Sequence, residues 1–455
     1  MKCSPLYFLA IVLSISTVIL DQTAIPVALP NIAASLHLSA VAERWVINAY
    51  LVSLGSFVIV VGKLSDTASK YRLFLLGNLG FLIASFFCAV STSAVMLISF
   101  RVLQGISGAI LLPITVLLIL QEAKEHEKGR WLGLYASFGS VCFAFGPVFG
   151  GWLTHLFTWK SVFLINLPIN AAGTLLLYFT ASSQLKSVVF SINLSKYGLE
   201  FAGFIGLIAS FFILIMNPKW SSYTALLIAV LLLSAVTITL CYHRKKEHLI
   251  DVSLLKNKVF IKYIVISVCV RLSMASLIFI AIYLERTLKT TPLLTGLLLL
   301  PMTLPSVFLS FFIGMLFDKY GPKPLIHTGT FLMALGLCVL ATVHGHNQYT
   351  MILLGTSLLG LGLPFAVNTV LTGALTGAPA NQRGQASSLI NLTRQLGTAF
   401  GVAIIGGVIS YMPLIIQAKK NVILTGFNYG IAAAAFFLII AFIISLRLPR
   451  RVKAI

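Results

Sequence analysis

The sequence predicts an all-α membrane protein whose chain crosses the bilayer many times. Of its 455 residues, 58% are hydrophobic and only 9% are charged, whereas a soluble domain carries about 25% charged residues. The apolar residues fall in runs of about 20, which is the length that a helix needs to cross a bilayer. Helices are expected rather than barrel strands, because a helix satisfies its own backbone amides and no alternating strand pattern is visible.

Fourteen apolar runs are predicted to form membrane-spanning helices. In chain order they cover residues 5–30, 40–62, 72–92, 94–120, 129–154, 161–181, 197–217, 221–241, 258–284, 293–316, 324–343, 348–376, 385–411 and 424–446. An even number of spans places both termini on one side. The loops on that side carry most of the lysines and arginines, so both termini are expected in the cytoplasm and the protein in a bacterial inner membrane.

Two loops share a pattern that predicts an internal repeat. The loop after the second span reads "GKLSDTASKYRLF" and the loop after the tenth reads "GMLFDKYGPKPLI", and both contain G-x-L-x-D followed by basic residues. We therefore expect two six-helix bundles of similar design. The predicted domains are residues 1–185, residues 186–257 with two linker helices and a cytoplasmic loop, and residues 258–455.

Asp21 is an acidic residue deep in the first span. It lies about 24 Å along a helix that rises 1.5 Å per residue, and a charged Asp at a helix centre costs about 2.5–3.5 kcal/mol. This cost is avoided if Asp21 faces a watery cavity or takes up a proton, so it is a candidate for proton coupling. The alternative is a residue at the outer interface, with Pro26 and Pro30 ending the helix rather than kinking it for gating.

The two repeated loops are candidates for a lock on the cytoplasmic face. Each Asp would pair with cations or a helix N-terminus while the outer side is open. The alternative is that the basic residues only set the topology. The candidate residues are Gly62, Asp66, Lys70, Arg72, Gly314, Asp318, Lys319 and Gly321.

Three arginines fall inside predicted spans. Arg101, beside Gln104, would hold a carboxylate ionised and release it when the geometry changes; the alternative is that its side chain reaches the nearby interface. Arg271 and Arg394, the latter one turn from Asn391, leave the deep charges with one acid and three bases. This excess would suit an anionic or zwitterionic substrate, or the arginines would bond helix carbonyls in a structural role, which is the preferred reading for Arg394.

The fifth span is rich in small residues. Such residues permit close helix contact, and a Gly-Pro pair permits a bend. A tight, bendable contact between the two bundles is expected here, with generic helix packing as the alternative. The residues are Gly139, Gly146, Pro147, Gly150 and Gly151.

Composition and motifs argue against several other functions. The net charge of +21 comes from basic residues scattered between spans, so nucleic-acid binding is not expected. The six cysteines show no metal-binding spacing, and no HExxH or GxxxxGK[ST] motif occurs. We therefore expect no cofactor, no metal and no enzymatic activity, and a gradient rather than ATP as the energy source.

Taken together, the motifs resemble the major facilitator superfamily, specifically its fourteen-helix drug:proton antiporter branch. The resemblance covers nearly the whole chain and rests on five stretches in the order typical of that branch: "LDQTAIPVALP", "GKLSDTASKYR", "RVLQGISGA", "GSVCFAFGPVFGG" and "GQASSLINLTRQLGTAFGVAI". The first loop departs from the family pattern at Thr67, Ser69 and Tyr71, which weakens the expected lock in that half.

The resemblance implies a function and roles for several residues. It implies proton coupling and cation recognition at Asp21, a proton relay at Arg101, and a fifth-span glycine motif that limits leak. We expect a proton-coupled exporter of small amphipathic compounds that works by alternating access; the alternative is export of a specific metabolite such as a siderophore or an organic acid. The expected partners are the substrate, protons and lipid, and the sequence leaves open whether a periplasmic adaptor protein takes part.

Overall fold

The computed structural model describes residues 4–67, 69–124, 128–186, 253–344, 348–378, 383–415 and 422–449, with short pieces at 202–203, 205–206, 232–234 and 236. Within these ranges every regular element is a helix. Among the described segments, 11 helices are long and apolar enough to cross a membrane. The predicted all-α membrane fold is confirmed. The predicted spans 197–217 and 221–241 lie mostly outside the described residues, so the number fourteen remains a prediction.

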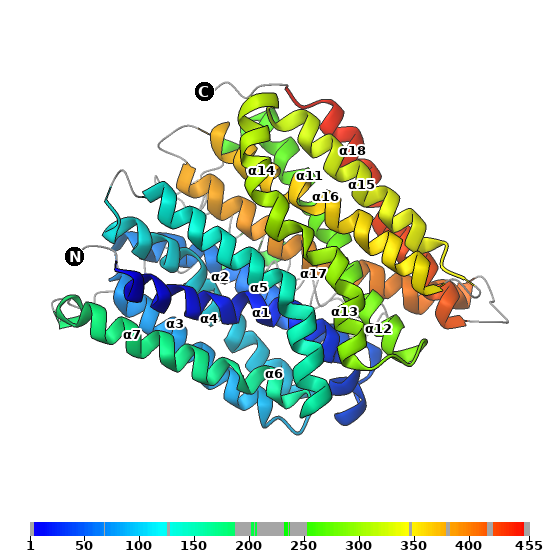
Figure 1. Ribbon diagram of the computed structural model, residues 1–455, viewed down its shortest axis with the longest axis horizontal. Coiled ribbons are helices and arrows are strands. Elements are labelled where there is room, and N and C mark those ends of the chain that lie inside the picture. The colour runs from blue at the N-terminus through cyan, green and yellow to red at the C-terminus, as the bar shows by residue number, and fades with distance from the viewer. Residues whose placement is uncertain are drawn as a thin grey trace.

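The helices up to residue 186 form one group in space (Figure 1). They are α1 (Pro5–Ser35), α2 (Ala40–Thr67), α3 (Lys70–Ala89), α4 (Ala94–Glu122), α5 (Lys128–Leu156), α6 (Lys160–Leu164) and α7 (Asn166–Lys186). Within this group α1 packs on α5 and α7, and α4 packs on α2 and α3.

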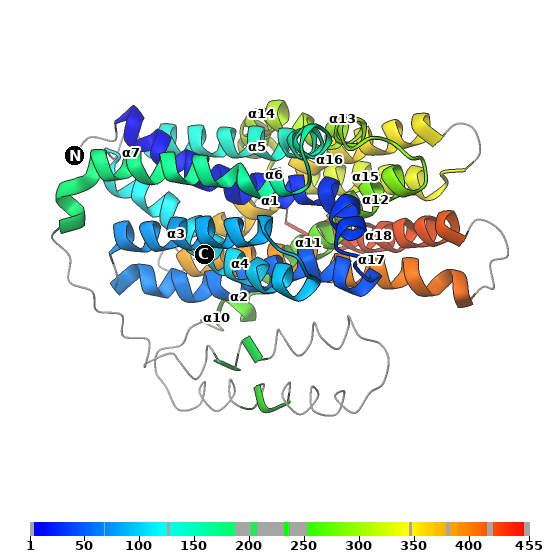
Figure 2. The same cartoon turned by 90° about the horizontal axis from the view of Figure 1, so that it is seen from below.

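The helices from residue 253 onward form a second group beside the first, with the long helices running roughly parallel (Figure 2). They are α10 (Ser253–Lys256), α11 (Lys258–Met274), α12 (Ser276–Arg286), α13 (Pro292–Thr303), α14 (Pro305–Tyr320), α15 (Pro322–Ala341), α16 (Gln348–Thr376), α17 (Arg383–Ile415) and α18 (Val422–Leu446). The groups meet where α5 packs on α13, α2 on α17 and α1 on α12. We call them the first and second halves; the exact domain limits stay a prediction.

Proline positions explain where some predicted spans are interrupted. The predicted spans 161–181 and 293–316 each consist of two helices, with breaks at Ile165 and Leu304. Pro168 and Pro305 lack the amide hydrogen that would bond one turn back across these breaks. The predicted span 258–284 is also divided, at Ala275, without a proline.

In contrast, α1 continues without interruption past Pro26 and Pro30 to Ser35. The reading in which these prolines end the helix is therefore wrong. Asp21 lies in the middle of a helix of 31 residues and not at its end. A helix of this length is more than sufficient to cross the hydrocarbon core of a bilayer.

Candidate functional site

A cavity of about 600 Å³ lies between the two halves. Its first-half lining includes Asp21, Gln22, Tyr50, Arg101 and Phe143. Its second-half lining includes Arg271, Met274, Leu277, Ile278 and Thr398. Most of the remaining wall is apolar, with Ile25, Pro26, Ile47 and Leu51. A cavity with an apolar wall and a few polar groups is the usual form of a small-molecule site.

Asp21 and Arg101 form a buried ion pair at the wall of this cavity. Arg101 Nη1 donates to Asp21 Oδ2, and the two residues are only 1% and 2% exposed. Arg101 Nε also donates to the backbone oxygen of Val46 at 2.9 Å, and its guanidinium lies 4.3 Å from the centre of the Tyr50 ring. The alternatives in which Asp21 lies at the interface and Arg101 extends to it are therefore wrong.

Gln104 joins both members of the pair. Its Nε2 donates to Asp21 Oδ1 at 3.2 Å and to Ser85 Oγ at 2.9 Å, while its Oε1 accepts from Arg101 Nη1 at 2.8 Å. Gln104 is fully buried. Buried charges are tolerated when they are paired and their remaining hydrogen-bonding groups are satisfied. The predicted trio Asp21, Arg101 and Gln104 is thus one connected network.

A glycine next to this network explains how α4 reaches α2. A Cβ atom on Gly105 would lie 2.4 Å from the backbone oxygen of Tyr50 and 2.0 Å from Ser53 Oγ. Only glycine permits so close an approach between these helices. The approach brings Arg101, one turn earlier on α4, within reach of the Val46 carbonyl on α2.

The glycine motif of α5 divides between two partners. A Cβ atom on Gly150 would lie 2.6 Å from the backbone oxygen of Ala24 on α1, within the same half. A Cβ atom on Gly151 would lie 2.2 Å from the backbone oxygen of Pro292 on α13, in the other half. The expected contact between halves therefore includes Gly151, whereas Gly150 packs inside its own half.

The remaining motif residues of α5 follow the same division. Gly146 faces Thr23 of α1, with the Thr23 Cβ at 2.8 Å from an added Cβ. Pro147 presents its backbone oxygen to Gly296 of α13, at 2.4 Å from a Cβ added there. Gly139 is looser, since an added Cβ would meet only the Ile19 side chain at 3.3 Å.

Polar contacts also join the halves at the end of the molecule where α1 connects to α2, opposite the chain termini. Asn31 donates to Glu285 at 2.9 Å, Arg286 to Glu43 at 3.1 Å, and Arg44 to Ser410 at 3.2 Å. Each contact links a first-half helix to a second-half helix. We call these six residues the closed end. Glu43 is 4% exposed, so its charge depends on Arg286 for compensation.

The predicted loop lock is only partly described. Gly62 lies near the end of α2, Lys70 and Arg72 begin α3, and Lys319 is exposed near the end of α14. Gly321 separates α14 from α15 with φ 77° and ψ 177°, a conformation open essentially to glycine alone. Gly314 lies in α14. The side chains of Asp66 and Asp318 lie outside the described part of the chain, so the lock stays a prediction.

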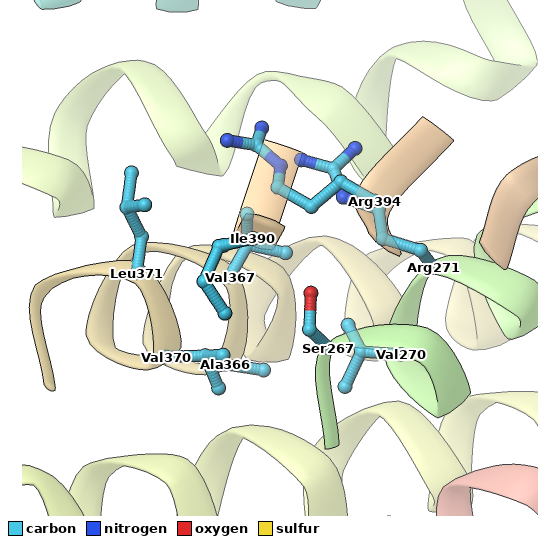
Figure 3. Close-up of a pocket in the computed structure, with 9 residues that line it drawn as sticks. All are labelled: Ser267, Val270, Arg271, Ala366, Val367, Val370, Leu371, Ile390 and Arg394. Atoms are coloured by element: carbon cyan, nitrogen blue, oxygen red, sulfur yellow. The ribbon is translucent and has the colours of Figure 1, made fainter. Parts of the chain in front are cut away.

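The second half brings two of the predicted arginines together. Arg271 on α11 and Arg394 on α17 line a smaller pocket of about 220 Å³, and Arg271 also lines the central cavity (Figure 3). Asn391 Oδ1 accepts from Arg394 Nη1 at 3.5 Å, which is too long for a strong hydrogen bond. The sequence did not indicate that these two arginines, 123 positions apart in the chain, are neighbours.

Sequence reasoning missed Tyr50 and Phe143 of the cavity and all six residues of the closed end. The two aromatic residues carry no signal, because aromatic residues are common throughout apolar spans. The closed end did have a signal in the sequence. Acidic residues number only 11 in this chain, and both Glu43 and Glu285 stand directly before an arginine at the end of a span.

Comparison with known proteins identifies the family. The sequence profile of the Major Facilitator Superfamily matches residues 11–189 and 263–454, which is most of the chain. The multidrug transporter protein MdtP of Bacillus subtilis is 27% identical over 86% of this chain and 72% of its own length. The riboflavin transporter RibZ of Clostridioides difficile is 27% identical over 92% of both chains.

Solved structures show the same fold. A bacterial homologue of the human lysosomal transporter Spinster, in an inward-facing and occupied conformation, matches with a TM-score of 0.68 and 16% identity, over 98% of this chain and 97% of that one. The family profile covers both halves that line the central cavity. The chain is therefore a member of the major facilitator superfamily and a multi-pass membrane transporter of small molecules.

Proposed function

We propose that this transporter is a proton-coupled exporter of small amphipathic compounds, of the fourteen-helix drug:proton antiporter type. The observation that carries the proposal is the network of Asp21, Arg101 and Gln104 at a cavity lined by both halves. A titratable carboxylate at such a place lets one proton influence how the two halves are arranged. Both termini are placed in the cytoplasm, and a bacterial inner membrane is the proposed location.

The ion pair supplies a simple coupling step. While Arg101 contacts Asp21, the carboxylate is stabilised in its ionised form. A movement of α1 relative to α4 separates the two charges and leaves the carboxylate among apolar groups, where the neutral form is favoured. Asp21 then takes up a proton. Return of Arg101 releases the proton on the side to which the cavity has opened.

The closed end supplies the conformational element of the cycle. Alternating access requires the contacts between Glu43 and Arg286, Asn31 and Glu285, and Arg44 and Ser410 to separate when that end opens. Gly151, packed on α13, would stay as a pivot between the halves. Proton and substrate each shift this equilibrium only by their different affinity for the two states.

Export of one specific metabolite is the second candidate. It is supported by the similarity to the riboflavin transporter RibZ and by the two arginines that line the smaller pocket. The two candidates predict different ranges of transported compounds. A multidrug exporter would move compounds of different charge, whereas a metabolite exporter would be selective.

Proteoliposomes with an imposed pH gradient test the proposal. Transport of ethidium, riboflavin and 1-naphthoate would be measured for the wild type, Asp21→Asn and the control Lys258→Gln, which removes a charge from the exposed start of α11. We expect Asp21→Asn to abolish gradient-driven transport while the control retains it. Equal gradient-driven transport by Asp21→Asn and wild type would refute the coupling role.

A further inference from the structure

Arg271 and Arg394, both on second-half helices, have no acidic partner among the described residues. In the described part of the chain, the ion pairs are Arg101–Asp21 and Arg286–Glu43. Arg271 makes no hydrogen bond within this part of the chain, and its Nε is buried without a partner. Arg394 has only the 3.5 Å contact with Asn391. The structural role expected for Arg394, bonding to helix carbonyls, is therefore not seen in the described contacts.

Close packing of α17 on α11 holds the two arginines together. A Cβ atom on Gly397 would lie 3.1 Å from Arg271 Cβ and 3.0 Å from the backbone oxygen of Val268. A Cβ atom on Gly401 would lie 2.2 Å from the backbone oxygen of Leu272. Gly397 follows Arg394 by less than one turn. The glycines thus allow the Cβ of Arg271 to pack against α17, the helix that carries Arg394.

The guanidinium groups of Arg271 and Arg394 lie side by side above the smaller pocket in Figure 3. Two like charges placed side by side repel each other. Arginine keeps its proton in proteins, so the repulsion cannot be relieved by deprotonation. Both side chains are half-buried at the pocket, where water screens their charges only partly, so a counter-charge between them lowers the repulsion. The geometry therefore favours an anion between them.

The surroundings define what kind of anion fits. Asp21 and Arg101 compensate each other, so Arg271 gives the wall of the central cavity its excess positive charge, and Arg394 lies beside it in the smaller pocket. Arg271 lines both pockets and so connects them. The adjoining wall is apolar, with Met274, Leu277 and Ile278 on the second-half side. A guanidinium offers a planar pair of donors that matches a carboxylate.

We propose that Arg271 and Arg394 form a subsite for the anionic group of the substrate, and that the substrate is an amphipathic organic acid whose apolar body occupies the central cavity. This inference rests on the proposed export function and narrows its substrate class.

Binding to the purified full-length protein in uncharged detergent tests the subsite. The probes are 1-naphthoate and 1-naphthamide, which have nearly the same shape and differ in charge, and tryptophan fluorescence reports their affinity. We expect naphthoate to bind at least about tenfold more tightly than the amide. Arg271→Gln and Arg394→Gln should each weaken naphthoate binding by about tenfold or more, whereas Arg271→Lys should lose less.

Three controls keep the test decisive. Lys258→Gln removes one positive charge from the exposed start of α11 and should leave naphthoate affinity unchanged. Inorganic phosphate should compete weakly with naphthoate because it lacks an apolar body. Phosphatidylglycerol, compared with phosphatidylcholine in mixed micelles, tests whether the anion is a lipid headgroup. Competition by phosphatidylglycerol more effective than that of naphthoate itself would assign the site to lipid and overturn the proposal.

Equal affinity for naphthoate and naphthamide, or an unchanged affinity in both Gln variants, would also overturn it. Binding is measured without a proton gradient, so the result does not depend on coupling at Asp21. If the subsite fails while ethidium is still transported against an imposed pH gradient, the export function stands and only the substrate class is wrong. If naphthoate binds as expected but no compound is transported, the failure lies with the export function.

Discussion

Arg101 in the first half and the pair Arg271 and Arg394 in the second half have opposite electrostatic surroundings. In the first half, Arg101 is 1% exposed and bonded to Asp21, Gln104 and the Val46 carbonyl. In the second half, Arg271 and Arg394 face each other without an acidic partner among the described residues. A charge that the protein compensates itself suits a structural or coupling role. Charges left uncompensated at a cavity suit a ligand that brings the opposite charge.

The largest expected difference between the halves is in stability. Arg101→Met leaves the buried Asp21 carboxylate without its positively charged partner, which costs about 3–5 kcal/mol. Arg271→Met removes one of two repelling charges and should leave stability unchanged or raise it. The unfolding midpoint of the purified proteins in detergent measures both. A loss of stability in Arg271→Met equal to that in Arg101→Met would show that the two arginines are equally compensated.

A double variant sharpens this result. Asp21→Leu combined with Arg101→Met replaces the ion pair with apolar side chains of comparable size, which is often neutral or stabilising in protein interiors. We expect the double variant to recover most of the stability lost in Arg101→Met while gradient-driven transport stays absent. Recovery of transport as well would mean that the pair serves packing alone.

A smaller effect is expected at the contact between the halves. Gly151→Ala places a Cβ atom against the Pro292 backbone and should cost about 1–3 kcal/mol or force α5 and α13 apart. Gly139→Ala is the matched control on the same helix, because its added Cβ meets only a flexible side chain. Transport rate and unfolding midpoint should fall for Gly151→Ala alone. Similar losses in the two variants would exclude the close contact with Pro292 as the cause.

The smallest effect is expected at the closed end. The Arg286 side chain is 45% exposed, so its pair with Glu43 should contribute only about 0–1 kcal/mol. Glu43→Gln should therefore leave the unfolding midpoint almost unchanged but favour opening of this end. To measure this opening, Gln22 in the cavity wall is replaced by cysteine in an otherwise cysteine-free protein. The rate at which a thiol reagent added on the closed-end side labels that cysteine should rise. Unchanged labelling would exclude the pair from gating.

The three residues of the first-half network were candidates from the sequence because a scarce residue type marks the first of them. Asp21 in a long apolar run has few favourable environments, and Arg101 with Gln104 in a motif of the resembled family supplied the partners. It also predicted which helix carries the small residues for close packing. The division of that motif, with Gly150 facing α1 and Gly151 facing α13, depends on the rotation of α5 and was not readable from spacing.

The second-half pair could not be predicted for a related reason. Arg271 and Arg394 are neighbours only because Gly397 allows α17 to approach α11, and the partner of a small-residue face is a property of the assembled bundle. The closed end likewise depends on which helix ends meet across the two halves. The breaks at Ile165 and Leu304 were in principle predictable from Pro168 and Pro305.

The continuous helix α1 has a consequence for how water can reach Asp21. In a regular helix the N–H of residue 26 donates to the main-chain oxygen of Gln22, one turn earlier. Proline has no amide hydrogen, so Pro26 cannot make this bond. Gln22 borders the same cavity as its neighbour Asp21. Because residue 26 donates no helix hydrogen bond to it, the Gln22 carbonyl can accept one from a water molecule, and Pro26→Ala would supply the missing donor.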